Sequence, residues 1–363
     1  MSEKLIYWLW LSLALGPCSG RLLSLLDRFA YIEEIYESRE SAALASLLDA
    51  AEFSRVRKTP LERARRLYEF CGEKGIGVLP YSSPQYPERL RQTRYPPVLL
   101  YYTGSVSALC TDSLAGVGAR NATRYGRDAV KKICAPLARA GLTLVSGLAR
   151  GIDSEVHRTA LAEKALTVAV LGTAIDTTSP RNHEELRFEI ERSGGCVVSE
   201  YAPGTESFKG AFPLRNRLIS GLARAVLVFE AAKRSGTMIT ANWALDDGRE
   251  VIAVPGSIFA PNCEGTNRLI KQGAQVADCA EDVASLLDIK LPDETALKPE
   301  TKESPVSPEA QKILKALSEG ELTLDELAER TKLPPAKLLS ELTELELDGA
   351  LNSLPGPKYA LAI

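Results

Sequence analysis

The sequence predicts an extended, doubly wound α/β fold of the Rossmann-like type, with a mostly parallel sheet. Residues 106–288 alternate regularly between short apolar runs and helical segments. The runs are continuously apolar, which is typical of strands buried on both faces of a parallel sheet. A helical stretch precedes this region, and a Pro-, Glu-, Lys- and Thr-rich segment separates it from a final stretch. These observations predict a small helical N-terminal domain, the Rossmann-like domain, a linker and a C-terminal winged-helix domain.

Residues 1–75 are expected to form the helical domain. Leu5–Leu15 is apolar, but Glu3 and the poor cleavage site at 16–18 favour a buried first helix over a signal peptide. Further helices are expected at Arg21–Phe29, Ile32–Glu37, Ser41–Ala51 and Thr59–Cys71. The last of these has Thr59 as N-cap and Pro60 at its first position. A turn between two short helices makes the domain similar to SAM or helix-hairpin-helix modules, and the backbone amides of the latter bind phosphates. The Gly-x-Gly hairpin of those modules is absent, which favours a structural or docking role.

Residues 76–288 are expected to form the Rossmann-like domain, beginning with a proline-rich connector at 76–105 that ends in the strand Val98–Tyr102. The later strands are expected at Leu114–Val117, Leu142–Ser146, Leu166–Leu171, Cys196–Ser199, Ala225–Glu230, Glu250–Val254 and Gln275–Ala277. The helices between them are expected at 123–140, with Thr123 as cap, and at Asp153–Glu163, Asn182–Gly194 with a capping box, Asn216–Leu222, Thr237–Asp247 and Thr266–Lys271.

Residues 289–306 are expected to be a flexible linker, and 307–363 a winged-helix domain of three helices and a hairpin. The helices are expected at 307–317, from the capping box Thr323–Glu326 onward, and from Pro334 to Leu347. From Val306 to the end there are ten acidic and six basic residues. The third helix carries Glu341, Glu344, Glu346 and Asp348 against Lys337. This charge favours protein contact, or regulation of the core, over reading of duplex DNA.

Composition excludes several classes of protein. The 363 residues carry a net charge of −3 and a mean hydropathy of −0.07, and no apolar run reaches the roughly 18 residues of a membrane helix. The seven cysteines are scattered without a CxxC pair, and the two histidines lie far from them in sequence. This pattern predicts reduced thiols in a cytoplasmic protein, with no zinc site and no disulfide framework.

Small residues follow three of the expected strands, at Gly118–Gly126, Ser146–Asp153 and Gly172–Asp176. Backbone amides at such turns bind phosphates. The first turn holds only a partial GxGxxG, and the second strand ends without the acidic residue that would hold a ribose, which argues against a nicotinamide dinucleotide. The sequence has no P-loop, GxSxG or HExxH motif. A hydrolytic triad would need His157 or His183, and a helix-surface or core role is favoured for both.

Basic residues gather around the same strand ends. Residues 118–158 hold eight basic against three acidic residues, and residues 207–234 hold six basic residues against Glu230 alone. Cations along one edge suit a ligand with repeated phosphates better than a single nucleotide. Phe212 lies among them in an expected loop, where stacking on a base contributes about 1–3 kcal/mol. The same residue as a core anchor, with Arg215 and Arg217 in structural ion pairs, explains the segment equally well.

Several linked motifs then carry a family resemblance. They are Gly118-Ala119-Arg120 with Tyr125-Gly126, Ser146–Asp153, Ser199-Glu200-Tyr201, Phe212–Leu222, Ser235–Ala241, Val254-Pro255-Gly256 and Gly265-Thr266-Asn267. In order and spacing over about residues 75–285 the chain resembles the DNA-processing protein A family (DprA, also called Smf). The resemblance implies a non-enzymatic, cytoplasmic protein, without cofactor, metal or membrane association. Such a protein binds and protects single-stranded DNA, loads the RecA recombinase onto it during natural transformation, and forms a homodimer through the Rossmann-like domain.

The resemblance also implies a site. Arg120, Lys209 and Phe212 fall on family positions that contact DNA, and the loop from Ser146 to Gly151 lines the same pocket. The DNA-binding residues expected here are Gly118, Arg120, Ser146, Gly147, Ala149, Arg150, Gly151, Lys209, Phe212, Arg215, Asn216 and Arg217. Ala119 stands where the family usually has Ser.

Two other functions compete with this one. The first is a nucleotide phosphoribohydrolase that would use Glu230 at a strand end together with the segment Ser235–Thr240. The second is an adaptor that acts only through the winged helix. Base release from a nucleoside monophosphate would support the first, and a core without affinity for DNA would support the second.

Overall fold

The computed structural model describes residues 2–292, 307–318, 320–347, 350–354, 356 and 358–361. The chain forms two compact units, Met1–Pro292 and Asp293–Ile363. Most of the expected linker, residues 293–306, lies outside the described residues.

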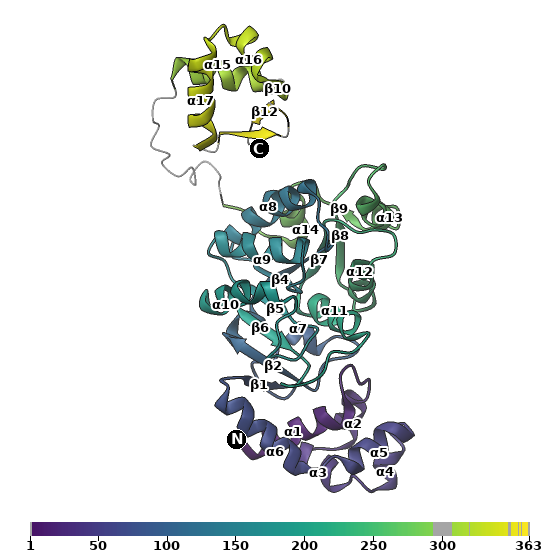
Figure 1. Cartoon of the computed structure of the whole chain (residues 1–363). Coiled ribbons are helices and arrows are strands. Elements are labelled where there is room, and N and C mark those ends of the chain that lie inside the picture. The colour runs from purple at the N-terminus through teal and green to yellow at the C-terminus, as the bar shows by residue number, and fades with distance from the viewer. Residues whose placement is uncertain are drawn as a thin grey trace. The chain divides into compact units, whose positions relative to one another are not determined.

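A nine-stranded, mostly parallel sheet forms the centre of the first unit (Figure 1). Its strands are β1 (Gly77–Pro80), β2 (Leu99–Gly104), β3 (Ser113–Val117), β4 (Thr143–Ser146), β5 (Thr167–Val170), β6 (Cys196–Ser199), β7 (Ala225–Val228), β8 (Glu250–Ala253) and β9 (Gln275–Val276). They lie in the order β1-β2-β6-β5-β4-β3-β7-β8-β9. The seven strands from β6 to β9 are parallel, and β1 and β2 are antiparallel additions at one edge. The predicted fold class is confirmed.

Both faces of the parallel strands are buried by helices. The helices of this region are α7 (Glu88–Arg91), α8 (Arg124–Arg139), α9 (Ile152–Ala162), α10 (Glu184–Arg192), α11 (Ala211–Leu222), α12 (Gly236–Asp246), α13 (Glu264–Lys271) and α14 (Ala280–Leu287). Three single turns, η1 (Val106–Cys110), η2 (Arg181–His183) and η3 (Pro261–Cys263), complete it. On β4, Leu144 packs with α8, α9 and α14, whereas its neighbour Val145 packs with α11 and α12. Burial of alternate residues on opposite faces explains why the strands are continuously apolar.

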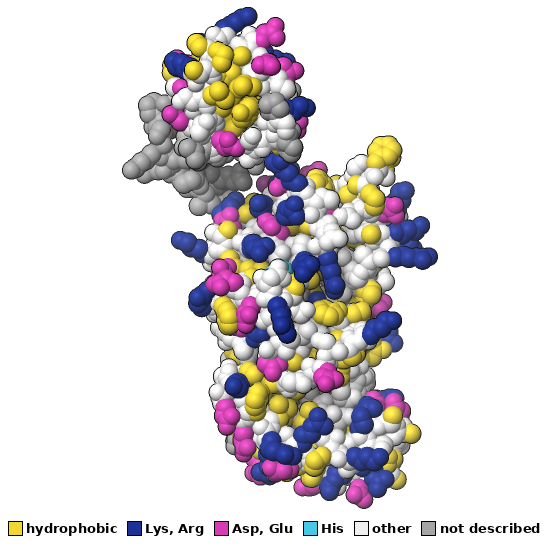
Figure 2. Space-filling model, viewed as in Figure 1, with side chains coloured by type: hydrophobic (Ala, Val, Ile, Leu, Met, Phe, Trp, Pro, Cys, Tyr) yellow, Lys and Arg dark blue, Asp and Glu magenta, His cyan; other side chains and the backbone are white. Residues whose placement is uncertain are grey.

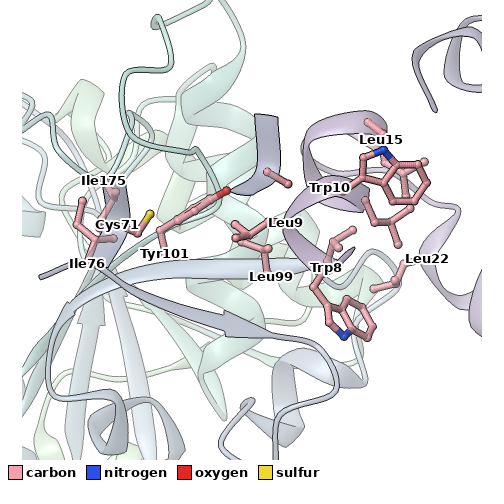
Figure 3. Packing of buried hydrophobic residues seen from close by; sticks show 14 of the residues in the cluster. Trp8, Leu9, Trp10, Leu15, Leu22, Cys71, Ile76, Leu99, Tyr101 and Ile175 are labelled. Atoms are coloured by element: carbon pink, nitrogen blue, oxygen red, sulfur yellow. The ribbon is translucent and has the colours of Figure 1, made fainter. Parts of the chain in front are cut away.

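The N-terminal helices share a hydrophobic core with the edge of the sheet. They are α1 (Ser2–Leu15), α2 (Leu22–Arg28), α3 (Ile32–Glu37), α4 (Ala42–Ala45), α5 (Ala50–Lys58) and α6 (Leu61–Glu73). Leu9 and Trp10 of α1 are fully buried in one cluster with Leu99 and Tyr101 of β2 (Figure 3). The prediction that the first helix is buried is therefore confirmed.

Four local predictions were wrong. The expected connector contains β1, because Gly77–Pro80 pairs with β2 even though the segment is rich in proline. The expected helix Ser41–Ala51 is two helices, and Asp49 caps the second by accepting from the Glu52 amide at 2.7 Å. Helix α6 begins at Leu61, so Pro60 is its N-cap. No side chain caps α10, because η2 replaces the expected capping box at Asn182.

The most consequential difference concerns α11. The sequence predicts this helix from Asn216, whereas it begins at Ala211, five residues earlier. Gly210 is its N-cap with φ +108°, a left-handed conformation that glycine adopts readily. Pro213 lies in the first turn, where its missing N–H costs no helical hydrogen bond. Phe212 is therefore part of a helix and not of a loop.

The second unit is a three-helix domain with a small antiparallel sheet, and the predicted winged helix is confirmed. It contains α15 (Pro308–Leu317), α16 (Leu324–Thr331) and α17 (Pro335–Leu347), with strands β10 (Leu322–Thr323), β11 (Leu351–Leu354) and β12 (Lys358–Leu361) in the order β10-β12-β11. Ile313, Leu327 and Leu342 are buried in its core. The expected capping box of Thr323 and Glu326 is present. On α17, Glu344 and Glu346 are exposed, while Asp348 lies outside the described residues.

Candidate nucleic-acid interface

A pocket of about 380 Å³ opens at the carboxyl ends of the central strands. It lies beside β3, where the strand order reverses. Strands β4, β5 and β6 lie on one side of β3, and strands β7, β8 and β9 lie on the other. Ligands of open α/β sheets bind at such switch points. The lining residues are Val117, Gly118, Ala119, Arg120, Asn121, Ala149, Asp153, Phe212, Pro213, Arg215, Asn216, Ile219, Ala232, Ser235, Gly236, Thr237, Thr240 and Asn262.

The two glycine loops of this pocket pack directly on each other. A Cβ on Gly118 would lie 2.5 Å from Ile152 Cγ1, and one on Gly151 would lie 2.2 Å from the Ala119 carbonyl oxygen. Gly151 also has φ +79°. The Ile152 amide donates to the Ala119 oxygen at 3.2 Å. The glycines thus allow the contact between the loops, which holds the first loop and Arg120 in place.

Arg215 and Asp153 form the buried floor of the pocket. Arg215 is 3% exposed, and its Nη1 donates to the carbonyl oxygens of Gly147, at 2.7 Å, and Val170. Burial lowers the pKa of Arg215 to about 10, against the opposing effect of Asp153. Burial likewise raises the pKa of Asp153, against the opposing effect of Arg215. Because this guanidinium already donates hydrogen bonds to two backbone oxygens, its main role is structural: it joins the ends of β4 and β5 to α11.

Phe212 and Arg120 form the wall above this floor. The half-buried ring of Phe212 lies 5.5 Å from the Arg120 guanidinium and 5.9 Å from that of Arg215. The ring packs on Gly172, where an added Cβ would approach Phe212 to 2.7 Å. Arg120 is exposed, and it has no hydrogen bond or ion pair to any residue that the structure describes. An exposed cation above an aromatic ring can bind a phosphate while the ring contacts a base.

The other predicted site residues divide into three groups. Asn216 lines the pocket and donates to the Gly236 oxygen at 3.2 Å. Arg150 and Lys209 are exposed but lie outside the lining. Ser146 and Gly147 are buried; the Ser146 hydroxyl donates to the Gly116 oxygen at 2.7 Å, which joins β4 to β3.

Arg217 serves the fold and not the pocket. It is 2% exposed, and its Nη2 lies 2.5 Å from Glu200 Oε2. The other oxygen of Glu200 accepts from the Cys18 amide at 3.1 Å, so this pair ties α11 to the N-terminal helices. Arg217, like Ser146 and Gly147, is buried and does not line the pocket, so the structure offers these three predicted residues no contact with DNA.

Sequence reasoning missed the uncharged polar part of the pocket. Asn262 Nδ2 donates to the Asn121 oxygen at 3.1 Å, and Ser235, Thr237 and Thr240 lie on the α12 side. These groups offer hydrogen bonds without charge. The sequence predicts Ser235–Thr240 as a family motif and as part of a phosphoribohydrolase site, but not as a DNA contact, and nothing in the sequence places Asn262 at this edge.

Glu230 is hydrogen-bonded to Thr123 and does not line the pocket. It is 1% exposed and accepts from the Thr123 amide at 2.9 Å and from the Thr123 hydroxyl at 2.6 Å, so it holds the start of α8. Both histidines are buried as expected for core residues, at 0% exposed for His157 and 5% for His183.

In the described part of the chain, the one group of close potential metal ligands is Asp278, Cys279 and Asp282, where Asp282 already accepts from the Asp278 amide at 3.0 Å. No helix of the described residues is long and apolar enough to cross a membrane. Figure 2 shows Lys and Arg side chains over the middle of the first unit and over the N-terminal helices, with Asp and Glu side chains among them.

The family described as DNA recombination-mediator protein A matches residues 77–288, and the DprA winged helix domain matches residues 297–357. The chain belongs to the DNA recombination-mediator protein A family. It is 38% identical over 285 residues to Protein Smf of Escherichia coli K12, which covers 77% of this chain and 76% of that protein. It is 40% identical over 212 residues to DNA processing protein DprA of Bacillus subtilis, which covers 58% and 71%. The resemblance to the DprA/Smf family is therefore confirmed.

Two solved structures of the family resemble the fold. DNA processing protein A from Streptococcus pneumoniae aligns with a TM-score of 0.66 and 30% identity, covering 78% of this chain and 97% of that one. DNA processing protein A from Helicobacter pylori aligns with a TM-score of 0.53 and 27% identity, covering 59% and 97%. The work on the Helicobacter pylori protein describes its single-stranded DNA binding mode.

Proposed function

We propose that this chain binds single-stranded DNA, without sequence preference, in the pocket at the carboxyl ends of the strands. The observation that carries the proposal is Phe212 beside the exposed Arg120, on the rim of a pocket whose floor is formed by Arg215 and Asp153. Phosphates would bind the amides of the first glycine loop and the Arg120 guanidinium, and a base would stack on the Phe212 ring. Lys209 and Arg150 would contact phosphates outside the pocket. Such contacts read no sequence, because every base has an aromatic face.

The relatives support the finer parts of the proposal. A relative of known structure binds single-stranded DNA, and the family is described as a recombination mediator. We accordingly propose that the chain protects single strands and loads RecA onto them, as in natural transformation, and that it does so as a cytoplasmic homodimer formed through the Rossmann-like domain. No catalytic step is part of this function.

The two competing functions have less support. A phosphoribohydrolase would need a free carboxylate, and Glu230 is committed to Thr123. An adaptor acting only through the winged helix would leave the pocket without a role. Both alternatives predict that substitutions in the pocket do not affect DNA binding.

Fluorescence anisotropy with a labelled dT oligomer tests the proposal at two salt concentrations. The wild type is compared with Arg120→Ala, Lys209→Ala and Phe212→Ala, with duplex DNA as competitor. We expect tight binding that salt weakens, that duplex does not displace, and that Arg120→Ala and Phe212→Ala each weaken by about 1–3 kcal/mol. Arg192→Ala is the matched control, because Arg192 is an exposed cation on α10, paired to Glu185 at 3.4 Å and outside the pocket. Binding that these substitutions leave unchanged would refute the site.

A further inference from the structure

A short apolar loop projects from the wall of the pocket. Ile258 is 81% exposed and Phe259 is 89% exposed, the two largest exposures among the large hydrophobic side chains of the described residues. Both lie in the connection from β8 to η3, and Phe259 is only three residues before Asn262, which lines the pocket. Three residues span at most about 10 Å, so Phe259 stands close to the pocket rim.

Hydrogen bonds hold both ends of this loop. At its start, the Tyr125 hydroxyl donates to the Pro255 oxygen at 2.5 Å. The Asn267 side chain bonds both the amide and the oxygen of Gly256, at 3.3 and 3.0 Å. At its end, the Ala231 amide donates to the Asn262 oxygen at 2.6 Å. Hydrogen bonds therefore hold both ends of the loop that exposes these two apolar side chains.

Exposed cations lie close in sequence to the residues that hold the two ends of the loop. Arg127 belongs to the first turns of α8, next to Tyr125, which bonds the start of the loop. Lys233 and Arg234 follow Ala231, which bonds its end. All three are exposed, and neither Lys233 nor Arg234 has a hydrogen bond or ion pair to a described residue. Two exposed acids accompany this group: Glu264 at the start of α13, and Asp128, which follows Arg127 and pairs with Arg124 at 3.5 Å.

We propose that Phe259 is a second stacking platform, which binds a base of the strand as it leaves the pocket. This inference rests on the proposed function. Alternating cations and an exposed aromatic match the chemistry of single-stranded DNA, whose phosphates repeat along the chain and whose bases present apolar faces. A second copy of this chain would place the same cations against each other, and like charges oppose that contact. The flanking cations therefore favour the nucleic acid as the occupant.

Oligomer length separates the two platforms. We compare dT oligomers of about 4 and about 12 nucleotides, which span the lengths that single-strand sites occupy. Phe259→Ala is expected to weaken the longer oligomer about tenfold and to leave the shorter one unchanged, because loss of one stacked base is worth about that factor. Phe212→Ala is expected to weaken both. Phe188→Ala is the matched control, because Phe188 is an exposed aromatic on α10 that lies outside the pocket lining.

A second variant gives a direct readout. Phe259→Trp is expected to retain tight binding of the longer oligomer, and its indole fluorescence is expected to fall when that oligomer binds. Equal affinities of wild type and Phe259→Ala for the longer oligomer would overturn the inference. So would an equal loss for both lengths with a shift from dimer to monomer in sedimentation velocity, which would assign the loop to a second copy. Failure of the wild type to bind either oligomer would instead refute the proposed function itself.

Discussion

The floor and the rim of the pocket use the same residue type in opposite ways. Arg215 and Arg120 both face the ring of Phe212. Arg215 is buried and donates to the Gly147 and Val170 oxygens, whereas Arg120 is exposed and has no polar partner among the described residues. A buried cation must find its acceptors inside the protein, because its desolvation is otherwise costly. An exposed cation keeps its donors for a ligand.

We therefore expect floor residues to determine the stability of the fold and rim residues to determine the affinity for the ligand. Substitution of a floor residue leaves buried acceptors or charges without partners, so it destabilises the fold. Substitution of a rim residue removes a hydrated group, so it changes only what the pocket binds. Substitutions at buried and at exposed positions can test this separation.

Removal of Arg217 should cost the most stability. Arg217→Met leaves Glu200 buried and unpaired, and breaking a buried pair in this way costs about 3–5 kcal/mol. Urea denaturation measures the loss. The double variant Arg217→Met with Glu200→Leu should recover much of it, because no buried charge then remains. Since neither residue lines the pocket, the affinity of the folded fraction for dT oligomers should stay that of the wild type.

His157 provides a pH test of burial without a charge partner. The Thr167 hydroxyl donates to the Leu144 oxygen, so it accepts from His157 Nδ1 at 2.7 Å. Burial lowers the pKa of His157 to about 3. Because the unfolded pKa is about 6.5, this group's stabilisation is complete above that pH and is lost as the pH falls toward 3. Between pH 7 and pH 4 we expect a loss of about 3 kcal/mol from this group.

The measurement is the difference in unfolding free energy between wild type and His157→Gln as a function of pH. The glutamine variant should show a shallower decline in acid. Parallel curves for the two proteins would show that His157 is not the group responsible.

Loss of Arg215 should lower both the stability of the fold and the affinity for DNA. Arg215→Met leaves two buried carbonyl oxygens and Asp153 without their cation, which costs about 1–3 kcal/mol of stability. Because Arg215 also lines the pocket behind Phe212, affinity for dT oligomers should fall as well. Chemical denaturation and anisotropy on one preparation check this. Loss of affinity with unchanged stability would place Arg215 on the rim and erase the distinction.

Arg120 should show the smallest effect, and only on binding. Arg120→Ala should leave the denaturation midpoint unchanged, because the side chain is exposed. It should lower the salt dependence of the log binding constant by about 0.7, the value of one phosphate contact to a single strand. Anisotropy at several salt concentrations measures this slope. A slope equal to that of the wild type would mean that Arg120 meets no phosphate.

Several elements could be predicted because their signals are local. The continuously apolar runs at Leu142–Ser146 and Cys196–Ser199 predicted parallel strands, and Thr123 predicted the start of α8, which it caps through the Gly126 amide at 3.2 Å. The antiparallel strand β1 was not predictable, because pairing with β2, and not its own composition, makes Gly77–Pro80 a strand. The early start of α11 was hidden by Gly210 and Pro213, which are typical of loops but also fit a cap and a first turn.

The residue pattern was enough to predict most strands and helices of the Rossmann-like domain, the glycine loops at the strand ends and the concentration of cations around them. These depend on residues near one another along the chain. Only the tertiary structure decided which cations the ligand can reach. Arg215 and Arg217 are two residues apart on one helix, yet one borders the pocket and the other meets Glu200 beneath it, while Asn262 reaches the pocket from a distant segment. The physical reason is that the burial of a charge depends on which backbone and side-chain acceptors the fold brings to it, and these come from residues far away in sequence.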